Sequence, residues 1–435
     1  MRKMFTFLKK QPTARIIALG FVLAILIGAG LLILPCSVKE GVSLSYIDSL
    51  YTSTSAVCVT GLIVVDAADT FTLFGQIILC TLIEVGGLGV TAIGAGIILA
   101  IGKKMDLKGR NLIHDAMNLS SGKAAVSFIK SLFLTTLVIQ ATGAILSFSV
   151  FIQDFDIGKA VWISIFHSVA SFNNAGFDVL GGFQGLTLYQ NNIPLNLVTC
   201  VLIFLGGIGF LVIKEVLVKK FRWKKLSMHS KVVLSVSGFL IVVGTLLIKC
   251  SEDISWMGAF FTSVSARTAG FSTYSLGGFT RAGLLIVSIL MLIGASPGST
   301  GGGIKTSTFF VLIKGIKSAA TNTSEKAFRY AIPKEAFKKA AVIVLLAFFA
   351  VFVSTWMICL FQPELLLEDV LFEMFSAFGT VGLSTGITPV LETGSKIVSI
   401  FMMFIGRLGP LTIASIWHFS RGERVKFPEG NIAIG

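Results

Sequence analysis

Four short segments of the chain share one pattern, in which a single glycine closes a run of small and hydroxylated residues. The four glycines are Gly61, Gly176, Gly270 and Gly382, and an aromatic residue stands ten positions before each of them. The segments recur about every 100 residues, a period that is too long for the repeats of a solenoid. This length accommodates two membrane crossings and a loop. We therefore predict one structural unit that is built four times.

The chain is too apolar for a soluble globular protein, because 54% of its residues are hydrophobic and only 13% are charged. Most of its apolar runs reach the roughly 20 residues that are needed to cross the hydrocarbon core of a bilayer. We count eight runs in four pairs, at residues 16–35, 71–101, 125–151, 195–218, 232–249, 282–313, 340–361 and 396–417. A weaker apolar stretch of about 12 residues lies between the runs of each pair, as at 44–56, and is too short to cross. We expect these stretches to be re-entrant and to lead into the glycine segments.

The net charge of +14 is distributed unevenly along the chain. Basic residues gather near both termini and in the three long links between the pairs of runs, whereas acidic residues occupy the opposite loops. The positive-inside rule therefore predicts a multi-pass protein with both termini and the three links in the cytoplasm, and with the glycine segments on the outer side. This distribution argues against a nucleic-acid partner and makes the lipid bilayer the expected one.

The predicted fold is an all-α membrane protein in which eight transmembrane helices form four parallel helix–pore-loop–helix repeats around a pseudo-fourfold central pore. We place the cytoplasmic N-terminus at 1–12, the four pore repeats at 13–104, 120–222, 226–318 and 334–421, and the cytoplasmic C-terminal tail at 422–435. Six cysteines stand singly, without the spacing of a zinc site or a disulfide framework.

Glycine in a pore loop allows successive backbone carbonyls to face one axis, since it adopts dihedral angles that other residues resist. A ring of such carbonyls can replace the hydration shell of an ion. The short helix before each segment would direct the partial negative charge of its C-terminus at this ring and so favour a cation. Three of the four segments have no charged side chain just before the glycine. We therefore expect K⁺ rather than Ca²⁺ or Mg²⁺, which usually need carboxylate or water ligands.

The sixth apolar run is interrupted at 294–306 by five glycines and a proline, which no continuous helix tolerates. Irregular backbone at this depth is costly unless it lines a cavity. We therefore predict that this stretch is a gate that blocks the conduction path when in place and opens it when displaced. Lys305 adds a positive charge that opposes the passage of cations.

Three charged residues need partners inside the protein, one beside a glycine segment and two well inside apolar runs. Arg267 stands three positions before Gly270, and we expect it to point behind the ring toward carboxylates or carbonyls, because it would otherwise repel cations. Arg407 should face the protein interior, where the carbonyls of the broken sixth run are natural partners. For Glu84 we consider a basic side chain as the partner.

These features together resemble the bacterial Trk/Ktr/HKT superfamily of potassium transporters, and the resemblance covers nearly the whole chain. The length and the eight expected spans resemble the membrane subunits of Ktr systems more than the longer TrkH proteins. The resemblance implies a potassium-channel-like fold in one chain and K⁺ uptake across a bacterial plasma membrane, with Na⁺ as an activating ion in some members. It implies a homodimer on a cytosolic ring of nucleotide-binding regulatory subunits of the KtrA type, and no covalently bound cofactor.

The resemblance also implies which residues form the selectivity filter and the gate. The filter residues are Cys58, Val59, Thr60 and Gly61; Asn173, Asn174, Ala175 and Gly176; Arg267, Thr268, Ala269 and Gly270; and Gly379, Thr380, Val381 and Gly382. The gate residues are Gly298, Ser299, Thr300, Gly301, Gly302, Gly303 and Lys305, with Arg407 beside them. Cys58 departs from the threonine expected there, which matters only if that side chain contributes a hydroxyl. The chain has no nucleotide-binding motif of its own, so regulation by nucleotide requires a partner.

Two other classes of protein could have a similar composition. A Na⁺-coupled secondary transporter for a small solute also uses broken helices, but that class shows inverted repeats, whereas the basic links here follow every pair on one side. An intramembrane enzyme is not indicated, because the four histidines show no His-Glu-x-x-His pattern. The string Gly-x-Ser-x-Gly at 294–298 follows an apolar run instead of the strand that a nucleophile elbow requires.

Overall fold

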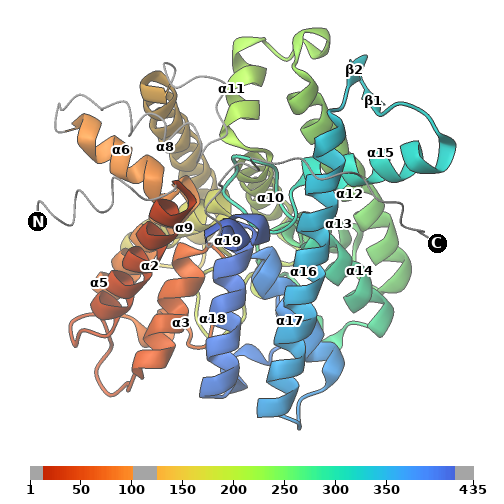
Figure 1. The fold of residues 1–435 in the computed structure, drawn as a ribbon. Helices are drawn as coiled ribbons and strands as arrows, with labels where there is room; N and C mark the ends of the chain where they lie inside the picture. Colours follow the sequence, from red (N-terminus) through yellow and green to blue (C-terminus); the bar gives the residue numbers. More distant parts are fainter. Residues whose placement is uncertain (1–12, 101–124, 417–435) are drawn as a thin grey trace, which may run out of the picture.

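The computed structural model describes residues 13–100 and 125–416, and most of these residues are in helices (Figure 1). In this part of the chain the only named strands are β1 (Lys326–Ala327) and β2 (Tyr330–Ala331), which form a small antiparallel hairpin. The predicted cytoplasmic N-terminus at 1–12 and C-terminal tail at 422–435 lie outside the described residues, as does most of the first long link.

Each glycine segment lies within a unit of three helices. The first helices are α2 (Thr13–Leu32), α8 (Ala125–Phe151), α12 (Met228–Ser251) and α16 (Lys334–Phe361). The second helices are α3 (Tyr46–Val57), α9 (Ile157–Asn173), α13 (Trp256–Ser265) and α17 (Leu367–Gly379), and each ends shortly before its glycine. The third helices are α5 (Leu73–Leu88), α10 (Ile193–Ile208), α14 (Arg281–Leu292) and α18 (Thr393–Leu408). Short α4 (Ala67–Thr70) and the 3₁₀ turns η2 (Thr187–Tyr189), η3 (Trp223–Lys225), η4 (Leu276–Gly278) and η5 (Thr388–Val390) lie in the connections.

Three of the third helices begin at a polar residue that caps their N-terminus. Thr72 accepts from the Gly75 N–H at 3.3 Å, Asn192 from the Leu195 N–H at 3.1 Å, and Thr280 from the Gly283 N–H at 3.1 Å. Such caps satisfy N–H groups that have no partner inside the helix. The caps therefore fix where the chain turns from the glycine segment back into a helix.

Three of the predicted apolar runs each contain two helices that are separated by a glycine. α5, α10 and α18 are followed directly by α6 (Val90–Ala100), α11 (Phe210–Val218) and α19 (Pro410–Ile416). The joints are Gly89, Gly209 and Gly409, with φ of 88°, 90° and 88°. These angles end a right-handed helix and suit glycine alone. The first two pairs bend by 98° and 99°, and hydropathy alone gave no sign of these bends in the runs at 71–101 and 195–218.

The third unit is interrupted differently. Its third helix, α14, ends at Leu292, and α15 (Thr306–Thr321) begins only after an irregular stretch at 293–305. We call this stretch the intramembrane loop. Its position agrees with the break that glycine and proline predict at 294–306.

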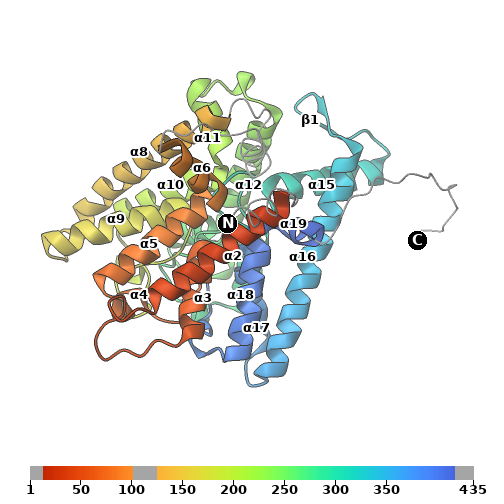
Figure 2. The ribbon, with the colours of Figure 1, turned by 60° about the vertical axis from the view of Figure 1, so that its left-hand side comes forward.

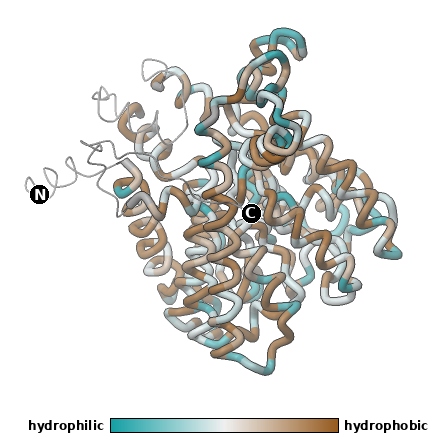
Figure 3. Tube along the Cα trace, turned by 45° about the vertical axis from the view of Figure 1, so that its right-hand side comes forward, coloured by the Kyte–Doolittle hydropathy of each residue, from teal (hydrophilic) through white to brown (hydrophobic). Residues whose placement is uncertain are grey.

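The apolar surface of the helices is suited to a lipid environment (Figure 3). By length and composition, four of the described helices can cross a membrane, and each of the two bent pairs would add one more if it is a single span. Large side chains such as Leu345 and Phe349 on α16 are each 69% exposed. The eight spans of the sequence analysis therefore stay a prediction, since α14 and α18 are short and α18 passes into α19 at a glycine.

The four units contact one another in cyclic order (Figures 1 and 2). Each third helix packs against the second helix of the next unit: α5 against α9, α10 against α13, α14 against α17, and α18 against α3. Trp162 of the second unit donates to Gln76 of the first at 2.7 Å. Lys396 of the fourth unit forms a 2.6 Å ion pair with Asp48 of the first. The fourth unit thus returns to the first, and the units close into a ring.

Candidate functional site

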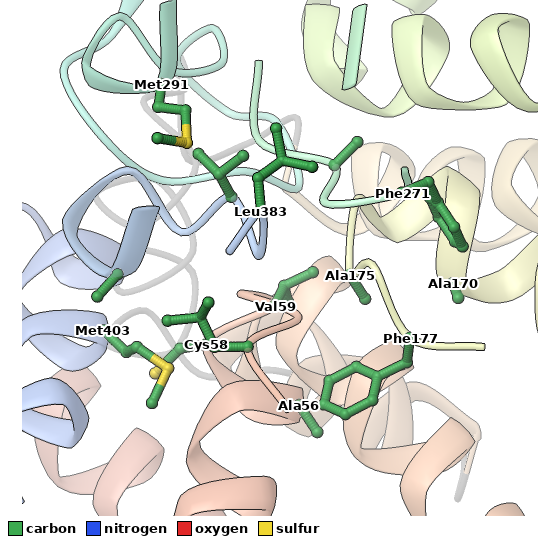
Figure 4. Packing of buried hydrophobic residues seen from close by; sticks show 14 of the residues in the cluster. Ala56, Cys58, Val59, Ala170, Ala175, Phe177, Phe271, Met291, Leu383 and Met403 are labelled. Atoms are coloured by element: carbon green, nitrogen blue, oxygen red, sulfur yellow. The ribbon is translucent and has the colours of Figure 1, made fainter. Parts of the chain in front are cut away.

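The four glycine segments meet at the centre of this ring. A methyl group added to any of the four glycines would lie too close to a backbone carbonyl of the next segment. The carbonyl oxygens concerned are those of Ala175 for Gly61, Ala269 for Gly176, Val381 for Gly270 and Thr60 for Gly382. Figure 4 shows Val59, Ala175, Phe271 and Leu383 on the four separate loops around this region. The glycines are therefore needed for the close approach of neighbouring segments.

The backbone of the four segments follows one conformational pattern. The glycines have φ of 88°, 64°, 79° and 94° in chain order. The residues two positions earlier also have positive φ: Val59 at 57°, Asn174 at 59°, Thr268 at 77° and Thr380 at 50°. The residue between them has negative φ in every segment. An alternation of left-handed and right-handed residues turns successive carbonyls toward the same side of the chain.

Hydrogen bonding supports this orientation. The N–H of the residue before each glycine donates back to the end of its short helix, as from Thr60 to Ser55 O at 2.7 Å and from Val381 to Ser376 O at 2.9 Å. The carbonyl oxygens of the four residues in each segment accept no hydrogen bond from any residue that the structure describes. Buried carbonyls normally have a partner. Their arrangement around one centre is suited to a cation.

Two segments have an additional serine brace. Ser55 Oγ accepts from the Gly61 N–H at 3.0 Å, and Ser376 Oγ accepts from the Gly382 N–H at 3.0 Å. The matching positions in the second and third units are Ala170 and Val264, which have no hydroxyl group. These serines were not among the predicted site residues, although hydroxylated residues before the glycine are part of the repeated pattern.

The electrostatics of the short helices also favour positive charge. α3, α9, α13 and α17 end just before the four segments, so their C-terminal partial negative charges are directed at the same region. A cavity of about 410 Å³ lies on the side of the ring away from these helix ends and is lined by all four glycines. Asp178, on the loop after the second segment, also lines this cavity.

Arg267 points away from the centre of the ring. Its side chain is 7% exposed and donates to Ser237 O at 3.3 Å and Gly294 O at 3.4 Å. The prediction that this arginine points behind the ring toward carboxylates or carbonyls is confirmed, and its partners are carbonyls. Among the described residues its Nε has no hydrogen-bond partner.

The intramembrane loop lies against the third and fourth glycine segments, since an added Cβ on Gly301 would meet Thr268 and one on Gly302 would meet Thr380. Its N–H groups donate to helix-end carbonyls of two other units, from Ser296 to Gly207 O at 3.0 Å and from Gly303 to Gly406 O at 3.3 Å. The Gly302 N–H donates to the hydroxyl of Thr380 at 2.8 Å. These bonds place the loop beside the fourth segment and between the second and fourth units.

Arg407 connects this loop to the first unit. Its guanidinium donates to Thr300 O in the loop and to Gly86 O at the end of α5. The partners are carbonyls of the broken third unit and of a second broken helix, as the position of Arg407 in an apolar run predicts. Lys305 Nζ donates to Gly301 O at 2.6 Å. Both basic side chains of the predicted gate, Lys305 and Arg407, therefore contact the backbone of the loop.

The structure gives different partners for Glu84 from the one we considered. Its carboxylate accepts from the amide of Gln140 at 2.7 Å and from the amide of Asn173 at 2.6 Å, and no basic side chain pairs with it among the described residues. Asn173 is the first residue of the second segment, so Glu84 connects α5 to this segment. Amide donors satisfy a carboxylate without adding a second charge at this depth.

Cys58 is fully buried in the main hydrophobic cluster, to which Met403 also belongs (Figure 4). Its thiol therefore lies among apolar side chains. This position favours a contribution from its backbone carbonyl alone.

Comparison with known proteins places the chain among transport proteins. The family model described as "TrkH: Cation transport protein" matches residues 16–241 and 230–420. The potassium/sodium uptake protein NtpJ of Enterococcus hirae is 36% identical, over 98% of both chains. The Ktr system potassium uptake protein B of Bacillus subtilis is 34% identical, over 97% of this chain and 96% of that protein.

A solved structure supports the fold. The potassium transporter TrkH from Vibrio parahaemolyticus superimposes with a TM-score of 0.73 over 93% of this chain and 85% of that chain. The sequence identity is 17%, so this similarity concerns the arrangement of the helices.

Proposed function

The chain belongs to the TrkH family of cation transport proteins, and from this membership we propose that it is the potassium-translocating membrane subunit of a bacterial K⁺ uptake system. The family consists of transport proteins and not of enzymes, in agreement with the sequence analysis. The two relatives described above are named for the uptake of potassium, or of potassium and sodium, and they match this chain over nearly its whole length. Their names support K⁺ as the transported ion.

The observation that carries the proposal is the ring of carbonyl oxygens without donors. Cys58–Gly61, Asn173–Gly176, Arg267–Gly270 and Gly379–Gly382 form the selectivity filter in this proposal. Their alternating φ and their cyclic contacts support a coordination shell of main-chain oxygens for a dehydrated ion. K⁺ dehydrates more readily than Mg²⁺, which retains water or carboxylate ligands.

The intramembrane loop is the gate in this proposal. Gly301 and Gly302 lie beneath the third and fourth filter segments, so an ion that leaves the filter meets the loop. Lys305 and Arg407 bring positive charge to the same place. Displacement of the loop from the carbonyls of Gly207 and Gly406 would open the path.

The proposal extends to assembly and orientation. We propose a homodimer in the plasma membrane with cytoplasmic termini, bound to a cytosolic ring of nucleotide-binding subunits, and with Na⁺ as an activating ion. The basic links support this orientation through the positive-inside rule. The name of the Bacillus subtilis relative, a Ktr system protein, is that of one component of a larger system and supports a regulatory partner. The boundaries at 13–104, 120–222, 226–318 and 334–421 define the four repeats of this proposal.

A symporter for a small solute receives less support. Such a protein would be built from two inverted halves around a solute site. The cyclic contacts between third and second helices recur with the same helix types in all four units, which favours parallel repeats.

Rescue of growth at low K⁺ tests the function. The chain would be expressed in a bacterial strain that lacks K⁺ uptake, with and without Na⁺ and a regulatory subunit, and K⁺ accumulation would be measured. We expect rescue by the wild type and a higher uptake rate when Gly298–Gly303 is shortened. Uptake of an organic solute with Na⁺, in the absence of any K⁺ uptake, would refute the proposal.

A further inference from the structure

Thr380, in the fourth filter segment, adopts a backbone conformation that its side chain disfavours. Its φ is 50° and its ψ is 55°, in the left-handed region, and it is fully buried. A β-branched residue in this region is a genuine outlier, and surrounding contacts must hold it there. The contacts of Thr380 therefore indicate what keeps this segment in its observed shape.

One of these contacts comes from the intramembrane loop. The Gly302 N–H donates to Thr380 Oγ1 at 2.8 Å. The approach depends on glycine, because a Cβ atom on Gly302 would lie 2.6 Å from the same oxygen. The backbone N–H of Thr380 donates to Ala377 O at 3.2 Å, so the residue is also bonded to the end of α17. Thr380 thus contacts the loop through its hydroxyl and the end of α17 through its backbone N–H.

The equivalent residues in the other units share the positive φ but have different side-chain partners. Val59 has no hydroxyl, and Asn174 is paired with Thr268 across the second and third segments at 3.1 Å. A Cβ atom on Gly301 would overlap the side chain of Thr268, but the hydroxyl of Thr268 has Asn174 as its partner. The hydrogen bond to the loop backbone is therefore made by Thr380, in the fourth unit.

We infer that Thr380 is a positioning residue that couples the intramembrane loop to the selectivity of the filter. This inference rests on the proposed function. With the loop in place, the Gly302 N–H holds the side chain of Thr380 and stabilises the left-handed backbone between Gly379 and Gly382. When the loop moves away, this bond is lost and the fourth segment relaxes. Discrimination between K⁺ and Na⁺ therefore depends on the position of the loop.

The test is a double-mutant cycle between Thr380 and the loop. Thr380→Val preserves the shape of the side chain and removes the acceptor, and Thr380→Ser restores the hydroxyl. Each variant is made in the full chain and in a chain whose loop lacks Gly301 and Gly302. K⁺ uptake and its inhibition by Na⁺ are measured in the uptake-deficient strain, and the amount of folded protein is measured in detergent.

In the full chain, we expect Thr380→Val to raise flux and to weaken discrimination against Na⁺, each on the order of 2- to 10-fold, the effect of one hydrogen bond. Thr380→Ser should remain near the wild type. In the shortened-loop chain the same Thr380→Val change should have almost no further effect, since its donor is gone. Such non-additivity is the signature of direct coupling.

Equal effects of Thr380→Val in both backgrounds would overturn the inference, as would a selectivity that stays unchanged in the full chain. Thr380→Ala is a second way to remove the hydroxyl. If neither this variant nor Thr380→Val yields folded protein while Thr380→Ser does, the hydroxyl serves assembly and the inference fails. These outcomes differ from failure of the proposed function, in which the wild type itself would show no K⁺ uptake.

Discussion

Replacing the four filter glycines one at a time by alanine should produce a graded loss of selectivity, with Gly176→Ala the mildest. The grading follows from two features of the structure, the φ angle at each glycine and the space around an added methyl group. Gly176 has φ of 64°, close to the left-handed minimum that other residues can occupy. The remaining three have φ of 79° to 94°, farther from that minimum.

The space around the four positions leads to the same order. At Gly176 the added Cβ would lie 2.9 Å from Ala269 O and 3.0 Å from the Cα of Gly270, so a small shift relieves the contact. At Gly61, Gly270 and Gly382 the Cβ would overlap a carbonyl oxygen of the next segment, which must then move. The left-handed conformation alone costs an alanine roughly 1–2 kcal/mol. For Gly176→Ala this corresponds to about a 5- to 30-fold change in the population of the selective filter, and the other three should exceed it.

The assay is K⁺ uptake in the strain without its own K⁺ transport, with the Na⁺ concentration that halves uptake as the measure of selectivity. Expression of each variant is checked by the amount of folded protein. Gly158→Ala is a matched control, because an added Cβ there meets no atom within 4 Å and Gly158 lies at the start of α9. Four equal effects, or a Gly176→Ala variant that is more severely affected than the others, would refute the geometric reasoning.

Two further predictions concern charged groups. Arg407→Gln should raise K⁺ flux and lower the melting temperature, because Thr300 O and Gly86 O lose their donor and the loop loses its link to α5. Flux is measured in inverted vesicles and the melting temperature by thermal unfolding. An unchanged flux together with an unchanged melting temperature would contradict this prediction. Burial and the nearby carboxylates of Asp66 and Asp69 raise the pKa of Asp178 to about 6, so its carboxyl is charged above that pH and neutral below it. K⁺ uptake at low K⁺ concentration should therefore fall as the pH on the cavity side drops from 7.5 to 5.5. In the Asp178→Asn variant, K⁺ uptake should change little over this pH range. A variant whose uptake depends on pH as in the wild type would show that another group is responsible.

The repeated segments and the broken sixth run could be found from the sequence because their signals are local. A glycine at the end of a short helix and a cluster of glycines with proline restrict the backbone in any surroundings. The carbonyl partners of Arg267 and Arg407 followed from a general rule, since an arginine at membrane depth must find acceptors. For this reason the outline of the candidate site was accessible before the fold was described.

The bends at Gly89 and Gly209 were missed because hydropathy continues across them. Residues 86–89 and 206–209 share the pattern Gly-Gly-x-Gly, but a glycine inside an apolar run is also common at close helix crossings. The structure shows that Gly86 and Gly206 allow α5 and α10 to approach the carbonyls of Val57 and Phe172, at the ends of the short helices. The partners of Glu84 could not be predicted, since Gln140 and Asn173 are 56 and 89 residues away in the chain.

One polypeptide contains four unequal units that close into a ring. This arrangement fixes both the number and the order of the units around the centre. In an assembly of four identical subunits, every substitution would appear in all four subunits. Here a substitution appears once, so the first and fourth units can each carry a serine brace and the third a buried arginine, while the fourth also supplies the hydroxyl that binds the intramembrane loop. Covalent linkage thereby permits gradual evolutionary adjustment of ion preference, one quarter of the circumference at a time.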